Sequence, residues 1–203
     1  MYIMNIFVLD QDPTQAAQLQ CDKHVVKMIV ESAQMLSTAH RVLDGILTKR
    51  PSKSGKTIVK YYELDDYEAE LIYYKAVHIN HPCSIWCRES EANYRWLWDH
   101  MFALCQEYTH RYGKMHKSES VLWPLRSSPL NIPKGGLTAF KLAMQSNPEC
   151  INKSDPIKSY RMFYQTKQNR FKMAWTKRNI PEWFEVMNAN VWLYVQWMQK
   201  RFY

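Results

Sequence analysis

The chain has few glycines: only 5 among its 203 residues, against 8 Trp, 13 Tyr and 7 Phe. A Gly-rich nucleotide-binding loop and a turn-dense β-sandwich both need many positions with positive φ, so this scarcity excludes both classes. The sequence is nevertheless 46% hydrophobic, which is enough for a real core and far above the content of disordered chains.

Membrane, disulfide and metal signals are also missing. No apolar run approaches the roughly 18 residues of a membrane span, and the opening MYIMNIFVLDQD lacks the basic region and cleavage site of a signal peptide. We therefore expect a soluble cytoplasmic protein with no membrane partner, inside the bacterial host if a phage encodes it. The 5 cysteines form no C-x-x-C pair, so we expect buried thiols, no metal site and no cofactor. The oligomeric state stays open.

Acidic residues are scarce in the second half of the chain. Between residues 108 and 181 there are 14 Lys and Arg against 3 acidic residues, and none of those 3 lies after residue 155. Clustered cations displace the counterions of a phosphate backbone, so we expect a nucleic acid, and DNA first, as the partner. The aromatic residues among these cations either stack on unpaired bases or face the core. The candidate phosphate contacts here are Arg161, Lys167 and Arg170.

The spacing of Gly and Pro predicts a mainly α fold. We expect one compact domain over residues 1–203, built around two long helices at about 14–42 and 84–112, with its basic half at about 108–181. A short extended segment over 3–9 precedes the first helix. Residues 44–57 and 114–136 are expected to be irregular, and shorter helices are expected over 65–78, 137–145, 156–178 and 183–201.

Polar residues at alternating spacings of 3 and 4 place a chemically diverse stripe on the first long helix. An exposed helix face could carry such a stripe without any function. An imidazole, a cation, a carboxylate and an amide within three turns are, however, the groups needed for proton transfer beside a charged substrate. The stripe consists of His24, Lys27, Glu31, Gln34, Thr38 and Arg41, and its first four members are candidate catalytic residues.

A second polar row on the 84–112 helix could face this stripe across a pocket if the two helices pack antiparallel. It contains Asn93, His100 and Glu107, of which His100 is a candidate catalytic residue. Just beyond, a Gly-centred turn carries many cations. It is either a solvated helix end or a phosphate clamp with Lys114, His116, Lys117 and Ser118 as donors, and Arg111 and Lys23 are further candidate contacts to the nucleic acid.

Two segments carry a resemblance to a known family. The first reads Cys-Asp-Lys-His over 21–24, followed by Lys27, Glu31 and Gln-Met-Leu over 34–36; the second reads Asn-His-Pro over 80–82, with Trp86 beyond. This pattern resembles the pyrimidine-dimer DNA glycosylases of the endonuclease V type, which are small phage and bacterial proteins. Two spacings, Asp to Lys and Pro to Trp, are one residue shorter here. The whole chain is also similar to tailed-phage proteins.

The resemblance implies a compact helical enzyme that acts on DNA. In the well-studied phage member the N-terminal amine attacks the sugar C1′ and a helix-borne Glu stabilises the intermediate. Glu31 is the only carboxylate on the matching stripe and is the candidate for the second role. The first role has no clear equivalent, because the chain starts Met-Tyr-Ile-Met-Asn. A desolvated lysine, Lys23 or Lys27, could form the Schiff base instead, or an activated water could attack.

Three functions remain open at this point. The first is a DNA glycosylase, with or without lyase activity, that flips a nucleotide into a pocket between the two long helices. The second is a phage DNA-modifying transferase that acts on a hypermodified pyrimidine. The third is a non-catalytic nucleic-acid-binding or host-antagonist protein.

Overall fold

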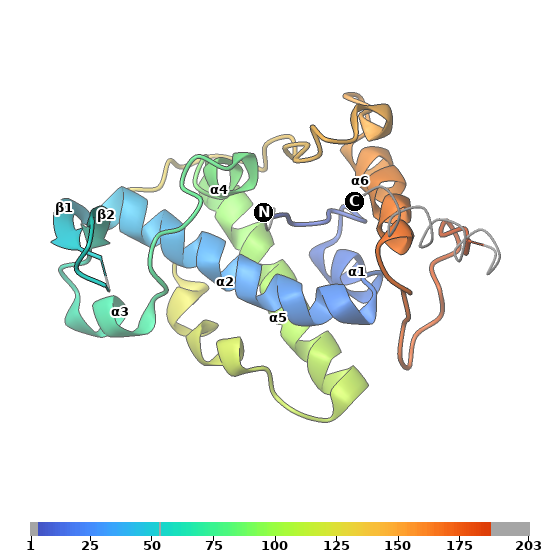
Figure 1. The fold of residues 1–203 in the computed structure, drawn as a ribbon, viewed down its shortest axis with the longest axis horizontal. Helices are drawn as coiled ribbons and strands as arrows, with labels where there is room; N and C mark the ends of the chain where they lie inside the picture. The colour runs from blue at the N-terminus through green and yellow to red at the C-terminus, as the bar shows by residue number, and fades with distance from the viewer. Residues whose placement is uncertain (1–3, 53, 188–203) are drawn as a thin grey trace.

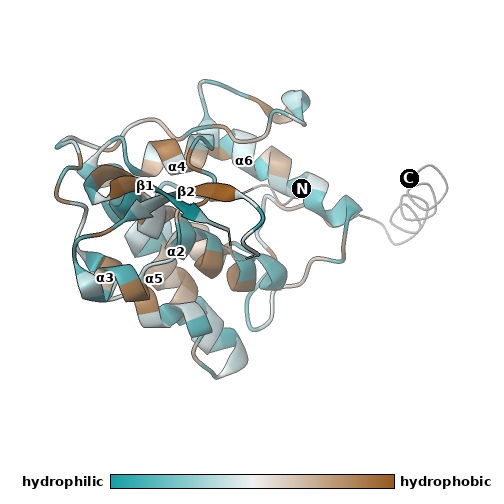
Figure 2. Ribbon diagram, turned by 60° about the vertical axis from the view of Figure 1, so that its left-hand side comes forward, coloured by the Kyte–Doolittle hydropathy of each residue, from teal (hydrophilic) through white to brown (hydrophobic). Residues whose placement is uncertain are grey.

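A computed structural model describes residues 4–52 and 54–187, and within them the fold is mainly α, as expected. Helices α2 and α5 cross at the centre of the molecule, the β1–β2 hairpin lies at one end and α6 at the other (Figure 1). Hydrophobic and hydrophilic turns alternate along α5 and α6 (Figure 2). The helices are α1 (Pro13–Gln18), α2 (Asp22–Asp44), α3 (Tyr67–Ile72), α4 (Pro82–Cys87), α5 (Glu91–Tyr112) and α6 (Pro156–Gln165).

The helix expected over 14–42 is two helices, α1 and α2, separated at Leu19–Cys21. Asp12 caps α1 by accepting a hydrogen bond from the Gln15 N–H, as its position before Pro13 suggested. The break follows from distant partners: the Cys21 N–H donates to the Tyr164 hydroxyl (2.8 Å) and the Asp22 N–H to the Ala174 carbonyl (2.8 Å). No local sequence signal marks this break.

The helix expected over 84–112 is also divided, into α4 and α5. The α5 helix has a cap of its own, because the Ser90 side chain accepts from the Asn93 N–H. It ends where expected, at Gly113, whose φ of 68° is the left-handed conformation that favours glycine at a helix C-terminus.

The core lies between α1, α2, α4 and α5, and the segment 4–9 runs through it. This segment was expected to be extended; it has no regular secondary structure, but all but one of its residues lie within the hydrophobic core cluster. The Asn5 side chain accepts hydrogen bonds from the N–H groups of Ile6 (2.8 Å) and Phe7 (3.1 Å). Phe7 is thereby held at φ 53°, a left-handed backbone that bulky residues rarely adopt.

The prediction of an irregular loop over 44–57 is wrong for much of that range. Strands β1 (Ile46–Pro51) and β2 (Ile58–Glu63) form an antiparallel hairpin in which Ile46 pairs with Glu63. The β-branched residues in both strands favour this conformation.

The expected helices after residue 114 were only partly correct. The segment 114–136 has only short 3-10 turns, and α6 and the 3-10 turn Thr166–Asn169 cover 156–169 of the expected 156–178. Residues 137–145 are not helical. The Thr138 N–H donates to the Asn93 side chain (2.9 Å), and the Thr138 carbonyl accepts from the Trp86 indole (3.4 Å), so neither group is available for a helix. The α3 helix is shorter than expected, residues 183–187 are not helical, and 188–201 lie outside the described residues.

Within the described part of the chain, none of the helices combines the length and the apolar character that a bilayer crossing requires.

Candidate active site

The polar stripe of α2 divides into two parts with different surroundings. Thr38 and Arg41 anchor the chain that follows the hairpin: Thr38 exchanges hydrogen bonds with the backbone of Val77, and Arg41 donates to four backbone carbonyls between residues 62 and 74. Arg41 also forms an ion pair with Glu70 (2.6 Å). The first four members of the stripe line cavities instead: His24, Lys27, Glu31 and Gln34.

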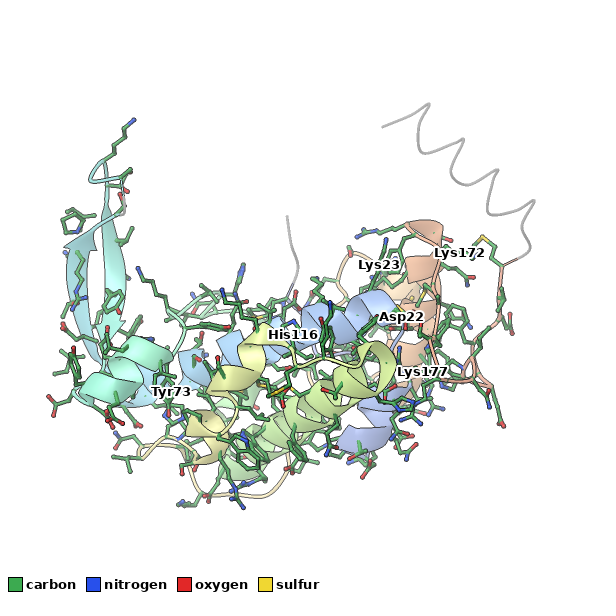
Figure 3. All side chains as sticks on the ribbon, turned by 90° about the horizontal axis from the view of Figure 1, so that it is seen from below. Asp22, Lys23, Tyr73, His116, Lys172 and Lys177 are labelled. Atoms are coloured by element: carbon green, nitrogen blue, oxygen red, sulfur yellow. The ribbon has the colours of Figure 1, made fainter. Side chains whose placement is uncertain are left out.

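Glu31 is buried, with 7% of its surface exposed, and is bonded on both oxygens. Lys27 Nζ lies 2.8 Å from Oε1, and the Asn5 backbone N–H donates to Oε2 at 3.0 Å. Because a cation and an N–H both point at the carboxylate, the site fixes a negative charge on α2. Figure 3 shows His116 between Lys23 and Tyr73 along the length of the molecule.

Two neighbouring cavities meet at Lys27, which lines both. The Glu31 cavity has a volume of about 400 Å³ and places two histidines from other segments on the same space as the carboxylate. His116 keeps its pKa below the usual value because it is partly buried, and its Nδ1 accepts the Ser118 N–H. The lining residues are Met4, Val26, Lys27, Val30, Glu31, Gln34, His78 and His116.

The second cavity, the Lys167 cavity, has a volume of about 490 Å³ and combines cations with aromatic rings. No carboxylate belongs to its lining as far as the structure describes the chain, so it attracts an anion. Figure 3 shows Lys23 on α2 near Lys172, at the α6 side of the molecule. The cavity is lined by Asn5, Phe7, Lys23, His24, Lys27, Ser146, Asn147, Phe163, Lys167, Arg170 and Phe171.

His24 is held as a neutral imidazole at the floor of this cavity. Burial, together with the nearby cations Lys27, Lys167 and Lys23, lowers its pKa to about 3. The Tyr164 hydroxyl accepts from the Cys21 N–H and lies 2.7 Å from His24 Nδ1. At neutral pH His24 therefore carries a single ring proton and no charge, so its imidazole adds no cation to the cavity.

Several sequence candidates lie away from both cavities. His100 is 0% exposed and bonds to the Pro13 carbonyl (2.9 Å) and to Gln20 (3.1 Å), and burial lowers its pKa to about 4. The side chain of Arg111 is 0% exposed and pairs with Glu107 and Asp22. We therefore propose neither residue for catalysis or DNA contact, and the second polar row does not face the α2 stripe.

The remaining cations differ in how freely they could meet DNA. Lys114 and Lys117 are exposed beside His116, and Lys23 and Arg170 are exposed at the Lys167 cavity. Arg161 is partly occupied, because its Nε donates to the Leu9 carbonyl (2.9 Å) and its guanidinium lies 3.4 Å from Asp10. The cationic residues that line the Lys167 cavity are thus the best placed to hold phosphate.

Sequence reasoning missed three residues of the site: Asn5, Phe7 and His78. Asn5 contacts Glu31 only through its backbone N–H, and Phe7 reaches the cavity through a left-handed backbone, so neither follows a helical or strand period. His78 precedes the Asn-His-Pro element by two residues and has a φ of 48°. The only sequence signal for His78 was that it is a polar residue just before the proline-containing turn over 80–82.

No group of three or more His, Cys, Asp or Glu in the described residues could hold a metal ion. All five cysteines are buried free thiols, as the absence of paired spacings suggested.

Comparison with known proteins gives one match. A family model described as "Pyrimidine dimer DNA glycosylase" matches residues 4–120, which include the segment 4–9, the whole α2 stripe and His116. No curated protein and no solved structure matches the chain. The match ends before α6, so it leaves out Phe163, Lys167 and Arg170.

Proposed function

The chain belongs to the pyrimidine dimer DNA glycosylase family, and we propose that it cleaves the bond between sugar and base where the Glu31 and Lys167 cavities meet. The observation that carries this proposal is Glu31, a buried carboxylate of the first cavity that is bonded by Lys27, which lines both cavities, and by the N–H of Asn5, which lines the second.

Glu31 stabilises the transition state by its charge. When the bond between C1′ and the base breaks, positive charge develops on the sugar, and a fixed carboxylate in a site shielded from water lowers the energy of that charge. The two donors keep the carboxylate in one orientation before the substrate arrives. Glu31 therefore acts as an electrostatic stabiliser and not as a proton donor.

The Lys167 cavity receives the flipped nucleotide. Its volume of about 490 Å³ lies within the range of small-molecule sites. The half-buried ring of Phe171 offers a face on which a base can stack, the buried rings of Phe7 and Phe163 form an apolar wall, and Lys23 and Arg170 provide cations for the flanking phosphates. Unstacking a damaged base requires only a few kcal/mol, which these contacts can offset.

Replacing Glu31 with glutamine tests the proposal. Glu31→Gln keeps the shape of the side chain and removes its charge, so we expect cleavage of the glycosidic bond at pyrimidine dimers in ultraviolet-irradiated DNA to fall by about 100-fold or more. The measurement is single-turnover excision at saturating protein, compared with DNA binding by the same variant, which we expect to change little.

Glu91→Gln is the matched control, because Glu91 also pairs with a lysine (Lys134, 2.9 Å) but is exposed and lines neither cavity. Excision by Glu91→Gln should equal that of the wild type. If Glu31→Gln also excises at the wild-type rate, Glu31 has no catalytic role, and a non-catalytic DNA-binding function gains support.

A second prediction concerns Arg170, which is exposed at the rim of the Lys167 cavity. We expect Arg170→Gln to weaken binding to DNA of any sequence and to reduce the slope of log K against log salt concentration by about 1, because one phosphate contact is lost. Lys49→Gln, an exposed cation on the distant β1 strand, is the control. Equal slopes for Arg170→Gln and the wild type would remove Arg170 from the DNA-binding surface.

A further inference from the structure

We propose that Lys167 is the amine that bonds covalently to C1′ of the damaged nucleotide. The inference rests on the proposed function and assigns a catalytic residue to the same site, in a part of the chain beyond the residues 4–120 that the family match covers.

The position of Lys167 is the first argument. The side chain reaches inward from the 3-10 turn Thr166–Asn169, and the residue is only 9% exposed. Its Nζ lies 3.3 Å from the centre of the Phe163 ring and 6.0 Å from that of Phe7, so it is held against two of the rings that line the cavity in which we place the flipped nucleotide. In the described part of the chain, no carboxylate pairs with this nitrogen and none lines its cavity.

The other two lysines of the cavity are less suited to attack. Lys27 forms an ion pair with Glu31, so its nitrogen is held at that carboxylate and is not directed at a nucleotide. Lys23 is exposed, and its Nζ lies 4.4 Å from the centre of the Phe171 ring. A desolvated amine among other cations is the arrangement that turns a lysine into a nucleophile, and Lys167 alone of the three has both features.

The surroundings of Lys167 also favour its neutral form. Burial and repulsion from Arg170 and Lys27 lower the pKa of Lys167 to about 8, and burial is the largest of these causes. Cys150 acts in the opposite direction. At pH 7 about one side chain in ten is therefore the free amine that the reaction needs.

The chemical step balances without any co-reactant other than water. The neutral Nζ of Lys167 forms a bond to C1′ while the bond from C1′ to the base nitrogen breaks, and the electron pair of that bond leaves with the base. The proton lost by Nζ goes to the base nitrogen, and the cleaved base stays in the DNA through its bonds to the other pyrimidine of the dimer. The nitrogen lone pair then opens the sugar ring to a C1′=N iminium ion, and O4′ takes a proton from water. Glu31 stabilises the positive charge at C1′ in both stages.

Borohydride trapping tests this assignment. Borohydride reduces the iminium ion to a stable secondary amine, so the wild-type protein should form a covalent adduct with irradiated DNA and with DNA that already contains an abasic site. After trypsin digestion we expect the adduct on the peptide 162–170, in which Lys167 is the only lysine. Mapping the wild-type adduct requires no variant to fold.

Variants give the second arm of the test. Lys167→Arg keeps the charge and Lys167→Met keeps the aliphatic stem, yet neither can form an imine, so adduct yield should fall to that of a reaction without enzyme. Lys172→Met, an exposed cation that lines neither cavity, should retain full yield. Thermal unfolding of each variant confirms that it is folded.

The outcomes separate the two proposals. If the wild type cleaves no glycosidic bond in irradiated DNA, measured as alkali-labile strand breaks at the dimers, the proposed function fails. If that bond is cleaved but the adduct maps to Lys23, Lys27 or the N-terminal amine, or no adduct forms, the role of Lys167 is overturned while the function stands. An adduct retained by Lys167→Arg overturns it equally.

Discussion

Replacing Arg111 with methionine should lower the free energy of unfolding by about 3–5 kcal/mol and leave the affinity for DNA unchanged. Its guanidinium donates to Glu107 (2.7 Å), to Asp22 (2.8 Å) and to the Gln18 carbonyl (3.1 Å). These bonds tie α5 to α1 and to the start of α2. Methionine fills a similar volume but leaves the buried Glu107 and the partly buried Asp22 with fewer partners, which is the main source of the loss.

Urea denaturation at pH 7, together with DNA binding, measures both halves of this prediction. Lys114→Met is the matched control, since Lys114 is an exposed cation three residues away and should change stability by less than about 0.5 kcal/mol. If Arg111→Met changes stability only slightly and weakens DNA binding, Arg111 contacts phosphate, as the sequence suggested.

The sequence predicted the α2 stripe well because a helix keeps its period regardless of what packs on it. His24, Lys27, Glu31 and Gln34 all line cavities, as their spacing indicated. The same period also included Arg41, which instead bonds backbone carbonyls of a segment whose path the sequence did not reveal. A periodicity identifies a shared face, but it does not say what that face meets.

The breaks in the long helices could not be predicted, because their causes lie far away in the chain. The Cys21 N–H bonds to Tyr164, and the segment 137–145 is held by Asn93 and Trp86 from α5 and α4. In each case a tertiary hydrogen bond replaces the local one that a helix would make. Asn5 and Phe7 were missed for the same reason, since their role depends on one backbone N–H and one strained residue.

Acid should unfold this protein more steeply than a protein with exposed histidines. Three buried histidines, His24, His40 and His100, have pKa values lowered by burial to about 3, about 4 and about 4. The unfolded chain binds a proton at each near pH 6.5, whereas the folded chain does not. The stability that comes from the neutral form is therefore complete above about pH 6.5 and is lost as the pH falls toward 4, by about 1.4 kcal/mol per pH unit for each histidine.

Between about pH 6 and pH 5 the three histidines together lower the free energy of unfolding by about 4 kcal/mol, a large part of the roughly 5–15 kcal/mol of a typical domain. Carboxylates with lowered pKa values, such as Glu70 and Glu107, lose their contribution only at lower pH, so this interval reports the histidines. The measurement is urea denaturation at half-unit steps from pH 7 to pH 5.

His100→Gln isolates one of the three contributions. Glutamine can still bond to the Pro13 carbonyl or to Gln20, so the fold is retained, but it does not titrate. We expect this variant to be less stable at pH 7 and to lose stability with falling pH by about 1.4 kcal/mol per unit less than the wild type. His110→Gln, which changes an exposed histidine, should follow the wild-type curve. Parallel curves for His100→Gln and the wild type would mean that His100 takes up its proton in the folded state. Both of its ring nitrogens would then donate, so the Gln20 amide would have to turn its oxygen toward Nε2.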